Sequence, residues 1–327
     1  MSFLKIRSIA HCFPEKCVSS EKLDDMLNLP QGTVLKKSGL HERYFVGDGE
    51  TAAGLGAKAT TAALSQGDLS CDDIDLIIGA SGVAQQPIPC NAALIQAELG
   101  WQKTGIPCFD VNSTCLSFLT ALNVASALLN THQYKRILIV SSELPSKGLN
   151  WDDLDSCTIF GDGAAACIVE RSELEKRHYT HQLITLSEGM NYCKIDAGGT
   201  KIPPAQIENR QDGLFHMDGQ SIYKIAGQTL SHIHQSILEK ANLTMDQIDY
   251  VIPHQASGLA LKHARRRLKI PRDKFIVRYP TIGNQMAASI PTVLSLLNQE
   301  GVLARGQRLY LIGTGAGFAA AATILEF

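Results

Sequence analysis

The stretch LSCDDIDLII at residues 69–78 returns as LTMDQIDYVI at residues 243–252, 174 positions further along the chain. Each copy reads as a turn that runs into a buried strand. Each also follows a run with helical periodicity, at residues 55–64 and 222–238. Self-similarity at a fixed spacing is the sequence signature of a duplicated structural unit.

Three further pairs of similar segments occur in the same order. They are KRILIV and QRLYLI (135–140 and 307–312), ALLN and SLLN (127–130 and 295–298), and AAACIVE and AAATILE (164–170 and 320–326). Chance matching of apolar strings is the alternative, but four collinear pairs argue against it. We therefore predict two duplicated halves, residues 1–171 and 172–327, with a joining insertion at residues 172–220.

Within each half, helical runs alternate with apolar β-rich runs. This alternation predicts an α/β fold whose buried, mostly parallel strands are covered by helices. The joining insertion includes DAGGTKIPPAQIENRQDG at residues 196–213. Its glycines and prolines predict a loop rather than a strand.

Composition narrows the class of protein. Hydrophobic residues make up 45% and charged residues 19%, and the formal net charge of −2 gives no reason to expect nucleic acid as a partner. Nine cysteines without a C-x-x-C motif argue against a disulfide framework or a zinc site. Without a signal-peptide core or an apolar run of ~20 residues, a cytoplasmic protein with no membrane span is expected.

Cys115 lies between a predicted buried strand, IPCFDV at residues 106–111, and a predicted helix, LSFLTALNVASALLN at residues 116–130. Cap-type residues fill the turn between them. The free N–H groups of a helix N-terminus lower the pKa of a nearby thiol, so this position suits a nucleophile. A buried thiol that only fills space is the alternative, and the segment by itself leaves both open.

Two other residues lie where a duplicated α/β fold gathers its functional groups. His254 follows the second copy of the repeated strand, and the carboxyl ends of parallel strands are where α/β sheets place their sites. Asn284 precedes a predicted helix at residues 287–297, which the repeat relates to the helix after Cys115. The two helix starts should therefore lie close together. The alternatives are a loop histidine and an asparagine that only serves the turn.

Three glycines near the C-terminus, in GTGAGF at residues 313–318, suggest a dinucleotide-binding fingerprint. The context is wrong for it, because the chain ends in a predicted strand and no βαβ unit can follow. A glycine-rich turn with exposed N–H groups, able to hold an oxyanion, fits better.

Several segments together resemble the thiolase superfamily, and within it the ketoacyl–acyl carrier protein synthase III type. They are DVNSTCLSFLTAL (110–122), IFGDGAAACIV (159–169), HMDGQSIYKIA (216–226), VIPHQAS (251–257), GNQMAASIP (283–291) and GTGAGFAAAATILEF (313–327). The resemblance implies thiolase-like duplicated halves in αβαβα layers, with two mixed, mostly parallel sheets. It also implies an acyltransferase that performs decarboxylative Claisen condensation.

The resemblance implies roles for individual residues. Cys115 would take an acyl group from a coenzyme A or acyl carrier protein thioester, and the N–H groups of Cys115 and Ala316 would form the oxyanion hole. His254 and Asn284 would stabilise the enolate that a malonyl thioester forms on losing CO₂. No permanently bound cofactor and no metal are expected. The substrate contacts would be Ile88, Leu116, Met217 and Phe318, with Ile88 reaching across a homodimer.

The chain departs from this family where coenzyme A is usually bound. Thr33 stands where a tryptophan is common, Lys37 and Leu259 stand where arginines are common, and residues 154–158 contain no arginine. Either the acyl donor arrives on a carrier protein or coenzyme A is held differently. These departures favour specialised fatty acid or polyketide synthesis.

The basic run KHARRRLK at residues 262–269 would place several cations on one broad helical face. A solvated surface is one interpretation, and a docking face for an acidic carrier protein is the other. The docking residues would be Lys262, Arg265, Arg266 and Lys269.

Two other functions compete with condensation. Cys115 could pass its acyl group to a hydroxyl or amine acceptor, but such a transferase does not need Asn284. The chain could also be a silent partner subunit of a heterodimer, but the intact set of Cys115, His254 and Asn284 argues against this.

Overall fold

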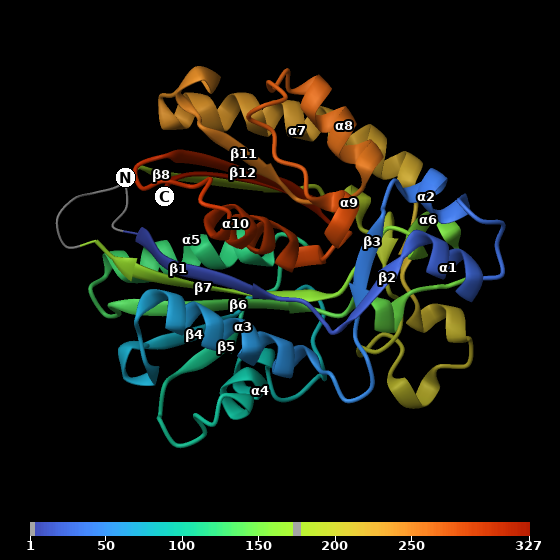
Figure 1. Cartoon of the computed structure of the whole chain (residues 1–327), viewed down its shortest axis with the longest axis horizontal. Coiled ribbons are helices and arrows are strands. Elements are labelled where there is room, and N and C mark those ends of the chain that lie inside the picture. Colours follow the sequence, from blue (N-terminus) through green and yellow to red (C-terminus); the bar gives the residue numbers. More distant parts are fainter. Residues whose placement is uncertain (1–3, 173–177) are drawn as a thin grey trace.

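The computed structural model of the chain describes residues 4–172 and 178–327. Helices and sheets alternate in five layers (Figure 1). The first sheet has the strand order β1-β7-β6-β4-β5 and the second the order β11-β12-β13-β8. The first sheet comprises β1 (Leu4–Cys12), β4 (Leu76–Gly79), β5 (Cys108–Asp110), β6 (Arg136–Glu143) and β7 (Gly163–Arg171). The second comprises β8 (Tyr179–Thr185), β11 (Tyr250–Pro253), β12 (Arg308–Gly315) and β13 (Ala319–Glu326).

Two helices, α5 (Ser117–Asn130) and α10 (Ser289–Gln299), form the layer between the sheets. Their apolar side chains are buried on more than one face and belong to one core cluster with strands of both sheets, as a helix enclosed on two sides requires. The outer layers are α3 (Ala52–Gly67) with α4 (Asn91–Glu98), and α7 (Gly219–Ala241) with α8 (Gly258–Arg267). The predicted layered α/β fold is therefore confirmed.

Shorter elements lie beside these layers. Within the described residues they are β2 (Lys16–Ser19), β3 (Glu42–Phe45), β9 (Cys193–Lys194), β10 (His216–Met217), α1 (Ser20–Met26), α2 (Thr33–Ser38), α6 (Leu154–Cys157), α9 (Tyr279–Ile282) and seven 3₁₀ turns, the last of which is η7 (Met286–Ala288). None of the helices in the described part of the chain combines the length and apolarity needed to cross a membrane.

The sheets are mixed, as predicted, but parallel pairing is less frequent than expected. Of seven strand pairs in the two large sheets, β4–β5, β4–β6 and β11–β12 are parallel and the other four are antiparallel. The reason is local in the second sheet, where a short turn after Gly315 joins β12 to β13 as an antiparallel hairpin.

The sequence repeat corresponds to repeated atomic detail. Capping boxes at Ser70 and at Thr244 open the two turns that precede β4 and β11. The next acidic residue of each copy then accepts a hydrogen bond from the neighbouring strand: Asp75 from Arg136 N and Asp249 from Arg308 N, both at 2.7 Å. Equivalent sequences therefore fix equivalent strand registers.

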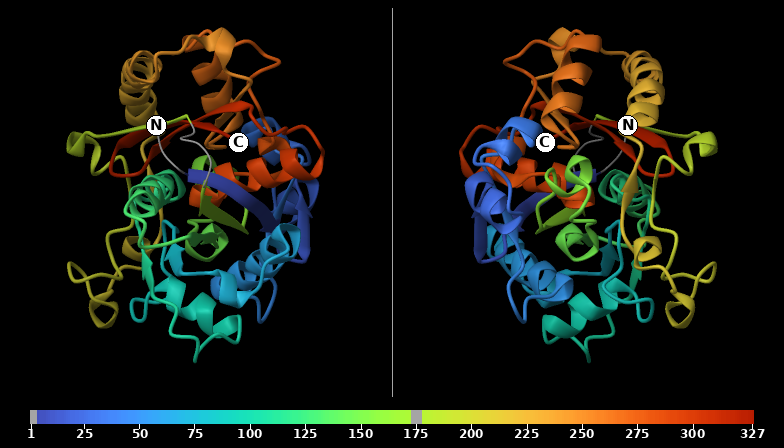
Figure 2. Two further views of the ribbon diagram at one scale, coloured as in Figure 1. Left: turned by 90° about the vertical axis from the view of Figure 1, so that its left-hand side faces the viewer. Right: turned by 90° about the vertical axis from the view of Figure 1, so that its right-hand side faces the viewer.

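The joining insertion at residues 172–220 contains more structure than the sequence suggests, because β8 lies within it and pairs with β13. β8 was missed because it is an edge strand with partly exposed residues and lacks a continuous apolar run. Residues 196–213 form a projecting loop with 3₁₀ turns, as predicted (yellow in Figure 2). Asp196 anchors this loop through Lys194 and Lys201.

The predicted buried strand at residues 106–111 is shorter and more exposed than expected. β5 has three residues at the edge of its sheet, and Phe109 is 38% exposed.

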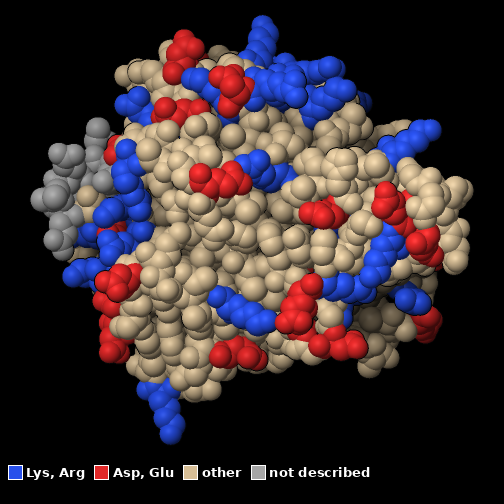
Figure 3. All heavy atoms as spheres, viewed as in Figure 1, with Lys and Arg blue, Asp and Glu red and all other residues tan. Residues whose placement is uncertain are grey.

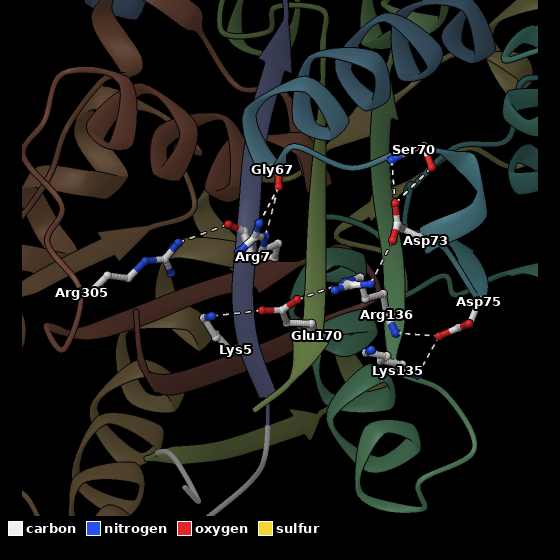
Figure 4. A network of polar contacts seen from close by, with 10 residues as sticks. All are labelled: Lys5, Arg7, Gly67, Ser70, Asp73, Asp75, Lys135, Arg136, Glu170 and Arg305. Atoms are coloured by element: carbon white, nitrogen blue, oxygen red, sulfur yellow. Dashed lines mark hydrogen bonds and ion pairs between the residues drawn. The ribbon is translucent and has the colours of Figure 1, made fainter. Parts of the chain in front are cut away.

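A polar network joins β1, β7 and β6 of the same sheet (Figure 4). Glu170 of β7 pairs with Lys5 of β1 and with Arg136 of β6, and Arg136 also pairs with Asp73.

Candidate active site

A cavity of about 690 Å³ lies between the two halves of the chain, and its lining is mainly apolar. Cys115, His254 and Asn284 all line it. They come from three elements: the start of α5, the end of β11, and the turn before α10. The structure thus brings the three predicted residues to one cavity.

Cys115 is presented by a tight turn. Thr114, the residue before it, has a φ of +52°, a left-handed conformation that is uncommon for a β-branched residue. Asn112 Oδ1 accepts a hydrogen bond from Thr114 N at 2.9 Å, and Ser117 Oγ accepts one from Ser113 N at 2.9 Å. These side chains hold the turn in shape and fix the position of the thiol.

Asn284 begins a second copy of the same turn. Its Oδ1 accepts a hydrogen bond from Met286 N at 2.9 Å, Met286 has a φ of +48°, and Ser289 Oγ accepts one from Gln285 N. Because Oδ1 is engaged by the backbone, the Nδ2 amide of Asn284 is left to donate into the cavity. The paired segments NSTCLS and NQMAAS carried this signal, which the sequence prediction did not use.

His254 directly follows β11, and its backbone N–H donates to Ile312 O at 2.8 Å. Gly313 is the neighbour that makes room for it, because a Cβ at Gly313 would lie 2.7 Å from His254 Cβ. His254 is 5% exposed, and burial lowers the pKa of its imidazole to about 4. The ring is therefore neutral at pH 7 and carries a single N–H.

The glycine-rich C-terminal turn packs against the turn that holds Cys115. A Cβ at Gly315 would lie 2.7 Å from Thr114 Oγ1, and Thr114 Oγ1 donates to Ala316 O at 3.3 Å. The N–H groups of Ala316 and of Cys115 itself face the Cys115 sulfur, where they favour a negative charge. Two backbone donors therefore converge on the Cys115 sulfur.

The expected lowering of the Cys115 pKa is not what the structure gives. Burial, followed by the charge of Glu143 and the nearby Cys193, raises the pKa of this thiol to about 12. The N–H groups of Ala316 and Cys115 oppose this effect but do not outweigh it. Desolvation dominates because the thiolate would lie in a cavity with a mainly apolar lining. The resting site is accordingly a neutral thiol and a neutral imidazole that line one cavity.

The predicted substrate contacts divide into two groups. Met217 and Phe318 line the cavity. Leu116 does not, because its side chain is fully buried against Gly313 and Gly315 in the core between the sheets. Ile88 does not line it either and is 83% exposed.

The predicted docking residues lie on and just after α8. Lys262, Arg266 and Lys269 are exposed, and Lys269 follows the end of the helix. Arg265 is half-buried and donates to Ile270 O, so it contributes less to the surface. Lys and Arg gather over this part of the molecule (Figure 3).

Two ionisable residues near Cys115 were not predicted. Glu143 is the last residue of β6 and is 1% exposed, and Cys193 of β9 lines the cavity. No motif identified Cys193. The end of a repeated strand, KRILIVSSE, was the available signal for Glu143, because His254 lies at the end of another strand.

Comparison with known proteins gives consistent matches. The sequence model of 3-oxoacyl-(acyl-carrier-protein) synthase III matches residues 109–186, and that of its C-terminal part matches residues 238–327. A beta-ketoacyl-(acyl-carrier-protein) synthase III of Neisseria gonorrhoeae is 31% identical over 327 residues, 100% of both chains. The protein of that name from Clostridium novyi is 29% identical over 324 residues, 99% of both chains.

A solved structure agrees with these sequence matches. The crystal structure of 3-oxoacyl-(acyl-carrier-protein) synthase III from Aquifex aeolicus matches with a TM-score of 0.89 and 27% identity. The match covers 99% of this chain and 100% of that one.

Proposed function

The chain belongs to the beta-ketoacyl-(acyl-carrier-protein) synthase III family of acyltransferases, and on that premise we propose a two-stage reaction at Cys115, His254 and Asn284. The observation that carries this proposal is that all three side chains line one cavity. Two backbone N–H groups also face the Cys115 sulfur.

In the first stage, the Cys115 sulfur attacks the carbonyl carbon of an acyl thioester. The new S–C bond forms as the bond to the carrier sulfur breaks, and the carrier leaves as a thiol with the proton that Cys115 gives up. The N–H groups of Cys115 and Ala316 hold the negative carbonyl oxygen of the intermediate. This donor pair offsets the unfavourable burial of charge that keeps the thiol neutral at rest.

In the second stage, a malonyl thioester loses CO₂, and the electron pair of the broken C–C bond becomes an enolate. The single N–H of neutral His254 and the Nδ2 amide of Asn284 donate to the enolate oxygen. The enolate carbon attacks the acyl-Cys115 carbonyl, the S–C bond breaks, and a β-ketoacyl thioester leaves. Cys115 departs as a thiolate and takes up one proton from water, which restores the resting thiol. Because decarboxylation generates the carbanion, the condensation step needs no strong base.

Trapping the two stages separately tests the proposal. On incubation with a panel of acyl thioesters, the intact protein should gain one acyl mass on the peptide that contains Cys115, and Cys115→Ala should gain none. Asn284→Ala should still load the acyl group but release ~10²-fold less CO₂ from the malonyl thioester, the typical loss for one such donor. An acyl group that moves to a hydroxyl or amine acceptor without CO₂ release would contradict condensation.

A carrier protein is the acyl donor that the surface supports best. Lys37 is occupied by an ion pair with Asp155 at 2.7 Å. Leu259, at the first turn of α8, is 72% exposed and offers no charge to a phosphate. Further along α8, Lys262 and Arg266 are exposed. Lys and Arg gather over this part of the molecule, and such a cationic surface suits an acidic protein (Figure 3).

The exposed surface around Ile88 and β5 supports assembly into a homodimer. Ile88 and Val83 are 83% and 48% exposed, and β5 presents a free sheet edge beside exposed Phe109. Covering such an edge with a second copy removes unpaired backbone groups and exposed apolar surface. Light scattering should find two chains, and Ile88→Asp should shift the population toward monomer.

The cysteines support a cytoplasmic location, and the replaced coenzyme A contacts support a specialised pathway. Cys115 must stay reduced to act, and all nine cysteines are free, which supports a reducing cytoplasm. The replaced coenzyme A contacts at Thr33 and Leu259 support a specialised fatty acid or polyketide pathway.

A further inference from the structure

Glu143 is a buried acid to which the proposed reaction gives no role. It ends β6, is 1% exposed, and its Oε1 accepts a hydrogen bond from Gly82 N. The N–H groups of Ala287 and Val83 also face the carboxyl group. Its other oxygen, Oε2, has no hydrogen bond to any described residue. A carboxyl group buried with so few partners is costly, so it should serve a purpose.

The N–H groups around Glu143 belong to the two segments that hold the reacting side chains. Gly82 lies against both of them: a Cβ there would be 2.9 Å from Met286 Cε and 3.3 Å from Thr114 Cα. Gly82 O also accepts a hydrogen bond from Asn112 Nδ2 at 3.1 Å. Gly82 is therefore held on its N–H side by Glu143 and on its carbonyl side by the turn that presents Cys115.

Ala287 completes the connection. It lies in η7, three residues after Asn284, and its N–H faces the same carboxyl group. We propose that Glu143 is a positioning residue for this reaction: it fastens the loop after β4 to η7, and its protonation state controls the reactivity of Cys115. This inference rests on the proposed function only in naming the reaction that is positioned.

The electrostatic part follows from proximity: Glu143 accepts the hydrogen bond from Gly82 N, and a Cβ at Gly82 would lie 3.2 Å from the carbonyl carbon of Thr114, which is bonded to Cys115 N. Among the described residues, the side chains whose charges raise the Cys115 pKa are Glu143 and Cys193, and of these two Glu143 has the pKa nearer neutrality. Burial raises the pKa of the Glu143 carboxyl to about 8, although the N–H groups of Gly82, Ala287 and Val83 lower it. Burial, and then the charge of Asp218, raises the pKa of Cys193 to about 12. The anionic form of Glu143 disfavours the Cys115 thiolate, and the neutral acid does not.

Alkylation of Cys115 by iodoacetamide, followed by peptide mass analysis between pH 6 and 10, tests this coupling without any acyl substrate. In the wild type, the logarithm of the rate should rise by one per pH unit below about pH 8, because the rate follows the thiolate fraction. Above that pH it should rise less steeply, because ionised Glu143 opposes the thiolate. Glu143→Gln should abolish this bend and react faster than the wild type at pH 9.

Asp162→Asn is the matched control. Asp162 is also fully buried, its pKa is also raised by burial, and it also accepts backbone hydrogen bonds, yet it does not act on Cys115. The Asp162→Asn variant should keep the bend. A straight wild-type profile, or a bend that survives in Glu143→Gln, would overturn the electrostatic part.

The kcat of the condensation reaction tests the positioning role of Glu143. Glu143→Ala should lose roughly 10- to 100-fold in kcat, because small displacements of reacting groups have effects of this size. Glu143→Gln keeps an acceptor for Gly82 N and should recover part of that loss. Wild-type kcat in Glu143→Ala would refute positioning. Because alkylation needs no acyl substrate, a failure of the coupling can be told apart from a failure of the proposed reaction.

Discussion

Gly313→Ala should separate the two stages of the reaction. The added Cβ would lie 2.7 Å from His254 Cβ and 3.2 Å from Leu116 Cδ2, and the first distance is too short for two carbon atoms. Both neighbours are buried, so the strands must move apart or His254 must turn. Overpacking of this kind costs about 1–3 kcal/mol of stability. A displacement of His254 by about 1 Å should lower condensation ~10²-fold.

Acyl loading should fall far less than condensation in this variant, because the severe 2.7 Å overlap falls on His254, whereas the turn that presents Cys115 meets only the longer 3.2 Å approach to Leu116 Cδ2. The assay compares acyl-enzyme formation by mass spectrometry with CO₂ release from the malonyl thioester. Gly219→Ala is the matched control, since a Cβ at Gly219 would meet no atom within 4 Å. Condensation within threefold of wild type, with unchanged stability, would refute the close contact on which this reasoning depends.

Two other predictions concern charge. Burial lowers the pKa of His254 from 6.5 to about 4, which corresponds to about 3 kcal/mol of unfolding free energy. The unfolded state binds the proton more readily, so this stability is present above pH 6.5 and lost as pH falls toward 4. In denaturant titrations, the free energy of unfolding of His254→Asn should therefore fall by about 3 kcal/mol less between pH 7 and pH 4 than that of the wild type. Equal losses of unfolding free energy in the two proteins would contradict a buried neutral ring. Lys262→Glu with Arg266→Glu should raise KM for a carrier-protein thioester about tenfold or more at low salt, with little effect on the same acyl group on pantetheine. Equal effects on both donors would argue against docking at α8.

The duplicated layers could be predicted because buried strands such as β4 and β11 leave clear apolar runs, and because their preceding turns are similar in sequence. Edge strands do not leave such runs. β8 was missed because its sequence, YTHQLIT, has three consecutive polar residues and only two adjacent apolar ones, and β5 was expected to be buried although Phe109 is partly exposed. Burial on one side only weakens the hydrophobic pattern.

In the candidate site, too, some features could be predicted from the sequence and others could not. Motifs placed Cys115, His254 and Asn284, since each lies at the end of an element with a readable sequence. The balance between desolvation and backbone donors at Cys115 could not be predicted, because it depends on how completely the cavity excludes water. Glu143 escaped notice because its partners are backbone N–H groups, which leave no trace in the sequence.

The turn that opens with Asn112 and the turn that opens with Asn284 share their hydrogen bonds and left-handed residues but not their chemistry. One copy presents a thiol at Cys115, and the other has Ala287 at the same position and turns its asparagine toward the cavity. Two identical chains related by symmetry could not carry different residues in these two turns, because every substitution would appear in both copies. Joining the copies in one polypeptide lets each turn specialise while a common scaffold keeps them face to face.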